Sequence, residues 1–78
     1  MNMAFRKRVS APRLAPDQAA RQGRVSRLAF EALRRPDAVI AFLNTHDDAL
    51  GGRPIDLAVA SEDGLLSVER ALAALPPA

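Results

Sequence analysis

The sequence predicts a small all-α domain of three to four helices, and two observations lead to that prediction. From Val25 to Leu33 apolar residues recur at i, i+3, i+4, i+7 and i+8, the spacing of one helix face. Alanine and leucine are abundant, and there are only three Phe and no Trp or Tyr, a composition that favours helix. The 78 residues contain no cysteine, so we expect a homodimer or another partner to add stability.

Residues 1–16 show no helical period and are expected to form a flexible basic arm ahead of a helical domain at residues 17–78. The first helix is expected to begin near Asp17, an N-cap or first-turn acid. Gly23 weakens this part, so a later start or a break at Gly23 is an alternative. Phe30 lies beside the apolar stripe and is interpreted as the edge of the core rather than a subunit contact.

Pro36 should end the first helix, because the residue before a proline is disfavoured in helical conformation. The run from Ala38 to Leu43 is apolar on all sides, which predicts a helix in the middle of the fold. A short buried strand would show the same run, but no second strand candidate exists.

The loop at 44–53 should lead into a short helix that starts at Pro54. Ser61 is the expected N-cap of a last helix that runs to about Leu75, where Pro76 and Pro77 stop it. Its apolar residues form a narrow seam suited to packing against another helix, namely Leu65, Val68, Leu72 and Leu75.

The net charge of +2 conceals an asymmetry between the two halves of the chain. Residues 1–35 hold nine Lys/Arg against two Asp/Glu (+7), whereas residues 36–78 hold two against seven (−5). A basic front can attract nucleic acid or an acidic protein surface, although a solvated arm and an outer helix face would show the same charges. No apolar run approaches the roughly 20 residues of a membrane span, and no secretory signal is evident, so we expect a cytoplasmic protein.

The loop contains the residues most suggestive of chemistry. His46 with Asp47 or Asp48 could in principle form an acid–base site, but no activated nucleophile accompanies them, and contiguous loop residues seldom converge on a metal. We interpret the aspartates as turn formers. The stretch "LGGRP" lacks the lysine and hydroxyl of a phosphate-binding loop. Its glycines allow positive φ, and Arg53 can tie loop carbonyls together or reach a carboxylate. No catalysis, cofactor or metal is expected.

Several of these residues together resemble a known family. The segment from Arg34 to Leu75 is similar to the toxin-binding domain of the MbcA/ParS/Xre antitoxins, and the resemblance covers about residues 24–75. The stretches that carry it are Phe42-Leu43-Asn44-Thr45, Leu50-Gly51-Gly52-Arg53-Pro54 and Ser61-Glu62-Asp63-Gly64. Arg53 directly precedes Pro54, where many members have one more residue. Residues 1–35 are too short for the helix-turn-helix domain that many members carry.

The resemblance implies an antitoxin whose partner is a RES-domain toxin, an NAD-consuming enzyme, and whose C-terminal end helps to block the toxin's active site. The residues to which it assigns toxin binding are Leu50, Gly51, Gly52, Arg53, Pro54, Leu72, Leu75, Pro76, Pro77 and Ala78. The alternative hypothesis is a small DNA-binding regulator that places cationic side chains on phosphates, namely Arg6, Lys7, Arg8 and Arg13. An enzyme that uses His46 is the third and least favoured hypothesis.

Overall fold

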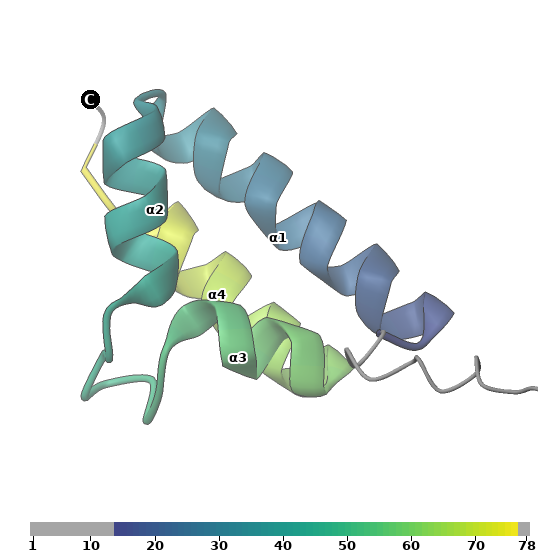
Figure 1. Cartoon of the computed structure of the whole chain (residues 1–78). Coiled ribbons are helices and arrows are strands. Elements are labelled where there is room, and N and C mark those ends of the chain that lie inside the picture. The colour runs from purple at the N-terminus through teal and green to yellow at the C-terminus, as the bar shows by residue number, and fades with distance from the viewer. Residues whose placement is uncertain (1–13, 77–78) are drawn as a thin grey trace, which may run out of the picture.

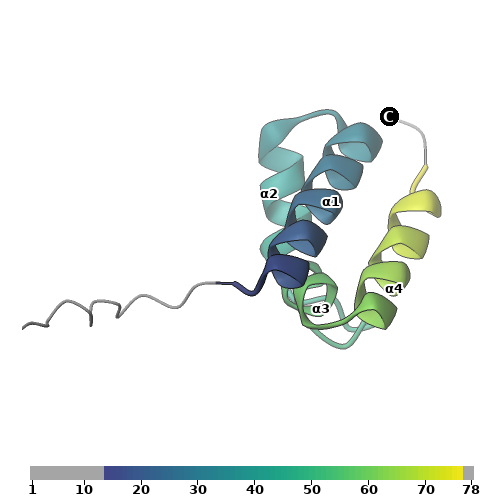
Figure 2. The same cartoon turned by 90° about the vertical axis from the view of Figure 1, so that its right-hand side faces the viewer.

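The computed structural model describes residues 14–76, and this part of the chain is a four-helix domain, as predicted (Figure 1). The helices are α1 (Pro16–Leu33), α2 (Pro36–Asn44), α3 (Pro54–Ala60) and α4 (Glu62–Ala73). Helices α1 and α4 lie side by side and run in the same direction, with α3 across one end and α2 returning from the end of α1 (Figure 2). No helix within residues 14–76 is both long and apolar enough to cross a bilayer.

Helix α1 is continuous through Gly23, so the predicted later start or break at that residue is wrong. Pro16 stands in the first turn, where its missing N–H costs no hydrogen bond, and the N–H of Ala15 donates to Gln18 Oε1 at 3.0 Å. The helix ends where Arg34 turns left-handed (φ 68°) and its N–H donates to the carbonyl of Phe30 at 2.7 Å. Arg35 is extended ahead of Pro36, as the proline requires.

The core lies between α1, α3 and α4. The fully or nearly fully buried apolar side chains are Val25, Ala29, Leu43, Ala58, Leu65, Val68 and Leu72. The predicted seam of α4 is therefore confirmed as a packing face: it packs on α1 and α3 of the same chain, with Leu75 only partly buried. Burying one such side chain contributes roughly 1.5–3 kcal/mol.

Helix α2 is not in the middle of the fold, so that prediction is wrong. It packs against α1 and α3 and has no contact with α4. Leu43 is its only buried residue, whereas Ile40 is 62% exposed. The run from Ala38 to Leu43 is apolar on all sides of α2, but α2 lies at the edge of the domain, so only one side of the helix is buried.

The step from α3 to α4 is tight. Ser61 caps α4 as predicted, with its Oγ accepting from the N–H of Gly64 at 2.9 Å. A Cβ at Gly64 would overlap the carbonyl carbon and oxygen of Leu57 in α3. Glycine at this position therefore sets how closely the first turn of α4 approaches α3.

Replacing Gly64 with alanine should lower the free energy of unfolding by roughly 2–3 kcal/mol, because the added methyl group meets backbone that cannot move aside alone. The matched control is Gly23→Ala, where a Cβ meets nothing within 4 Å. That change should raise the free energy of unfolding by about 0.5–1 kcal/mol, the usual gain of alanine over glycine in a helix. Urea denaturation followed by circular dichroism measures both; equal effects of the two variants would contradict the close approach.

Candidate functional site

The loop between α2 and α3 is closed by its own backbone and by Asp47. The N–H of Asp47 donates to the carbonyl of Gly52 at 3.0 Å, and the N–H of Gly51 donates back to the carbonyl of Asp47 at 2.8 Å. Asp47 Oδ1 accepts from the N–H groups of Ala49 and Leu50 at 2.9 and 3.1 Å. Asp47 is therefore a turn former, as predicted, and Gly51 has the positive φ (88°) that the glycine pair was expected to supply.

Arg53 and Pro54 lead from this loop into α3. Pro54 is fully buried at the first position of the helix. The guanidinium of Arg53 donates two hydrogen bonds to the carboxylate of Asp56, from Nε to Oδ2 at 2.8 Å and from Nη2 to Oδ1 at 3.0 Å. The predicted contact of Arg53 with a carboxylate is confirmed, and this pair holds the pKa of Asp56 below its usual value, chiefly through the hydrogen bonds.

His46 lies at the surface beside Asp48, with Nε2 at 3.1 Å from Oδ1, and both side chains are exposed. Among residues 14–76, no group of three or more His, Cys, Asp or Glu is arranged to hold a metal ion. The contacts of His46 within the described part of the chain are those of a surface histidine next to a turn.

The two parts of the surface to which the resemblance assigns toxin binding lie at opposite ends of the domain. The loop that contains residues 50–54 lies at one end of α2, and the end of α4 lies at the other (Figures 1 and 2). Leu72 is 6% exposed and belongs to the core, so only a small part of its side chain is accessible to a partner. Leu75 is partly buried against the core, and Pro76 is exposed.

Some candidate residues lie outside the described residues. They are Pro77 and Ala78 of the candidate toxin-binding set, and Arg6, Lys7, Arg8 and Arg13 of the candidate DNA-binding set.

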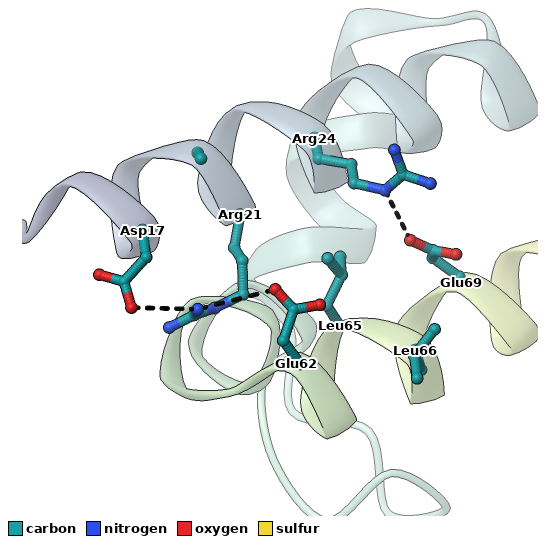
Figure 3. A pocket seen from close by; sticks show the side chains of 8 residues that line it. Asp17, Arg21, Arg24, Glu62, Leu65, Leu66 and Glu69 are labelled. Atoms are coloured by element: carbon teal, nitrogen blue, oxygen red, sulfur yellow. Dashed lines mark hydrogen bonds and ion pairs between the residues drawn. The ribbon is translucent and has the colours of Figure 1, made fainter.

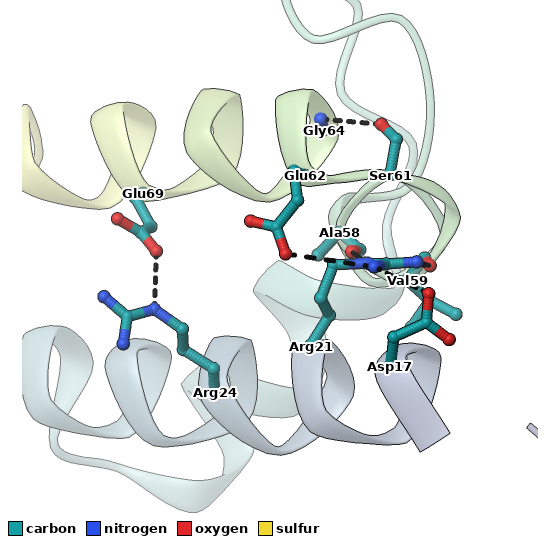
Figure 4. A network of polar contacts seen from close by, with 9 residues as sticks. All are labelled: Asp17, Arg21, Arg24, Ala58, Val59, Ser61, Glu62, Gly64 and Glu69. Carbon is teal, nitrogen blue, oxygen red and sulfur yellow. Dashed lines mark hydrogen bonds and ion pairs between the residues drawn. The ribbon is translucent and has the colours of Figure 1, made fainter. Parts of the chain in front are cut away.

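The most connected polar side chain of the described residues is Arg21, which the sequence analysis did not single out (Figure 4). Its Nε donates to the carbonyl of Ala58 at 3.1 Å, and its Nη2 donates to the carbonyl of Val59 at 2.7 Å. These carbonyls belong to the last turn of α3, where the helix cannot satisfy them itself. A cation at a helix C-terminus also interacts favourably with the helix dipole.

Two carboxylates lie near the guanidinium of Arg21. Nη1 is 3.5 Å from Asp17 Oδ2 and 3.9 Å from Glu62 Oε2, while the Arg21 side chain itself is 10% exposed. The sequence did carry a signal for this role. Arg21 precedes Val25 by four residues and so falls on the apolar face of α1, where a charged residue needs buried partners.

A groove runs along the face between α1 and α4, and one ion pair divides it. Arg24 Nε and Glu69 Oε2 are 2.9 Å apart across the groove (Figure 3). On one side is a hollow of about 380 Å³ near the start of both helices, with Ala20 and Leu66 among its lining residues. On the other side is a hollow of about 330 Å³, with an apolar lining of Leu28, Ala32, Leu72 and Ala73.

The basic front and the acidic back of the sequence therefore meet within the fold. Two arginines of α1, Arg21 and Arg24, lie beside two glutamates of α4, Glu62 and Glu69 (Figure 4). Residues 14–76 hold seven Arg and nine Asp/Glu, a net charge of −2, whereas residues 1–13 hold four Lys/Arg and no acid.

The fold and these surfaces define a small helical bundle with an ordered loop and a divided groove. Comparison with models of known protein families, with curated proteins and with solved structures finds no match for the chain.

Replacing Arg21 with methionine should lower the free energy of unfolding by roughly 2–3 kcal/mol, because the carbonyls of Ala58 and Val59 lose a charged donor while the apolar stem is kept. The matched control is Arg27→Met, on the exposed face of the same helix, which should cause no measurable change. Urea denaturation gives the free energies, and hydrogen exchange shows whether α3 opens first. Equal stabilities of the two variants would mean that Arg21 does not secure α3.

Replacing Arg53 with alanine should raise the pKa of Asp56 to the ordinary range, because the two hydrogen bonds that favour its charged form are lost. A lowered pKa stabilises the folded state above the ordinary pKa of aspartate, and that contribution disappears as the pH falls through the lowered value. The variant should therefore lose stability at neutral pH and converge with the natural chain in acid. Carboxyl NMR titration measures the pKa of Asp56 in the natural chain and in the variant. An Asp56 pKa that is the same in both would contradict the pairing. The control is Arg35→Ala, which should leave the pKa of Asp56 unchanged.

Proposed function

We propose that the chain is an antitoxin-like, toxin-binding module that neutralises a RES-domain, NAD-consuming toxin by covering the toxin's active site. It performs no catalysis of its own and binds its partner as a homodimer. The observation that carries the proposal is the order of the three motifs, each of which stands at a joint between helices. Phe42–Thr45 ends α2, Leu50–Pro54 forms the turn into α3, and Ser61–Gly64 begins α4.

The contacts within these motifs agree with a role in shaping a binding surface. Gly51, Asp47 and Arg53 are engaged in fixing the loop, and Gly64 sets the spacing of α3 and α4. A surface built in this way is held in one shape before a partner arrives, so little conformational entropy is lost on binding.

The C-terminal end is the part that would enter the toxin. Leu75 packs against the core and so fixes the direction in which the chain leaves α4, and Pro76 follows at the surface. Two consecutive prolines restrict the backbone of the tail, which lowers the entropy cost of inserting it. A domain with a net negative charge suits a pocket built to hold the phosphates of NAD only where cationic groups of that pocket are left unpaired.

Apolar side chains at the surface supply candidate contacts for the second copy in a homodimer. Phe30 is 49% exposed on α1 and does not pack on the core, so its interpretation as the edge of the core is wrong, and Ile40 is 62% exposed on α2. Large apolar side chains left at the surface of a small domain are typical of a protein–protein contact when they gather in a patch.

The alternative function is DNA binding by a small regulator, and the charge distribution favours it. Residues 1–13 carry four cations without an acid, which are Arg6, Lys7, Arg8 and Arg13. Such a segment binds phosphates without reading sequence, and its affinity falls steeply with salt. The two functions are compatible, because an antitoxin can also bind its own operator.

A pull-down with an N-terminal tag, which leaves the C-terminus free, should capture one stoichiometric RES-domain protein whose NAD-consuming activity is silent in the complex. Deleting residues 76–78 should then restore at least part of that activity, because the tail is removed while the helices, which end at Ala73, are kept. The matched control is His46→Ala, which should inhibit as the natural chain does.

If the truncated chain still neutralises the toxin fully, the tail is not needed for inhibition. The helical circular dichroism signal of the truncated chain shows whether it is folded. Capture of no partner above background, with DNA co-purifying at low salt, would favour the regulator instead. If His46→Ala loses function while its fold is intact, the hypothesis of an enzyme that uses His46 is favoured.

A further inference from the structure

The groove between α1 and α4 presents two depressions separated by a polar bridge: the first is lined mainly by charged side chains around a few apolar ones, and the second is mainly apolar. The first includes Ala20 and Leu66, the second includes Leu28 and Ala73, and the Arg24–Glu69 ion pair stands between them. Leu66 and Ala73 are seven residues apart on α4, which corresponds to roughly 10 Å along the helix axis. A ligand that filled both depressions would need two apolar groups at about that spacing.

The charge of the groove favours a cationic ligand. Four carboxylates and two arginines line the two depressions, so the lining is net negative. Asp17 and Glu62 lie beside Arg21, and Glu69 pairs with Arg24. Arg21 and Arg24 are already committed to Ala58, Val59 and Glu69. No ion pair of the Glu31 carboxylate occurs within residues 14–76, so it is available to a cation.

We propose that this groove binds residues 5–9 of the same chain, Phe-Arg-Lys-Arg-Val. Phe5 occupies the depression formed by Leu28, Ala32, Leu72 and Ala73, and Val9 occupies the depression beside Ala20 and Leu66. Phe5 and Val9 are four residues apart, roughly 13 Å in an extended chain, and they point to the same side. Lys7 points to the same side as Phe5 and Val9 and so faces the groove carboxylates, whereas Arg6 and Arg8 point to the other side and add positive charge to the segment.

The length and the origin of the segment permit this binding within one molecule. The segment joins the domain at Leu14, immediately before α1, and the groove begins at the same end of α1, at Asp17. Leu14 is nine positions after Phe5, and these nine steps span at most about 30 Å in an extended chain. The second depression lies about 18 Å along α1 from its start, measured to Leu28 at the rise of an α-helix. Binding within the chain also avoids the entropy cost of bringing two molecules together.

The test uses the full-length chain, which has no cysteine, so Met3→Cys provides a single site for a nitroxide spin label. The label should broaden the amide NMR signals of Ala32 and Ala73 in the second depression. Asn44 and Arg53 line a different hollow, beside Leu14, and should be affected less. A segment that does not enter the groove would broaden Asn44 and Arg53 at least as strongly as Ala73, and that result would overturn the proposal.

Matched variants separate specific binding from mere proximity. Phe5→Ala combined with Val9→Ala should remove the broadening at Ala73, and 1 M salt should weaken it by screening the cations. Ser10→Ala, in the same segment but outside residues 5–9, should leave it intact. Broadening that survives the double substitution would overturn the proposal. So would broadening of Ala32 and Ala73 in an unlabelled chain by a labelled one as strong as that within the labelled chain, because the segment would then bind the groove of a second copy. The measurement involves no toxin, so its outcome is independent of the proposed antitoxin function.

Discussion

The arrangement of the four helices depends on the guanidinium of Arg21, which ties the end of α3 to the first part of α1. Helix α3 has only seven residues, too few to be stable alone, and most of its terminal carbonyls have no partner within the helix. Arg21 donates to two of these carbonyls from a position that is almost fully buried. Asp17 and Glu62 lie close enough to offset its charge, so the buried cation is not left unpaired.

The other end of α3 is held by different means, and both ends together fix its place. Arg53 and Asp56 close the first turn from outside, while Pro54 is buried beneath it. Gly64 lets α4 approach the carbonyl of Leu57. The Gly-Gly-Arg-Pro turn is therefore a structural joint, and its residues set the geometry of the surface around it through contacts within the chain.

The local signals in the sequence predicted the joints well, because each acts over three or four residues. Ser61 as a cap, Pro54 as a helix start and Asp47 as a turn former need only their neighbours. The place of α2 and the role of Arg21 could not be predicted in the same way, since both depend on contacts between distant parts of the chain. The candidate binding residues show the same limit: the resemblance assigns toxin binding to Leu72, whereas the fold buries its side chain in the core.

The positive charge of the chain is distributed unevenly between the folded domain and residues 1–13. Folding places the arginines of α1 beside the glutamates of α4, so the described domain is slightly acidic and the cations without a nearby acid in sequence are those of residues 1–13. Under the two proposals above, residues 5–9 would lie either in the α1–α4 groove or on DNA phosphates, and the same side chains cannot do both at once. Occupancy of the groove by this segment would therefore compete with binding of nucleic acid and lower its apparent affinity.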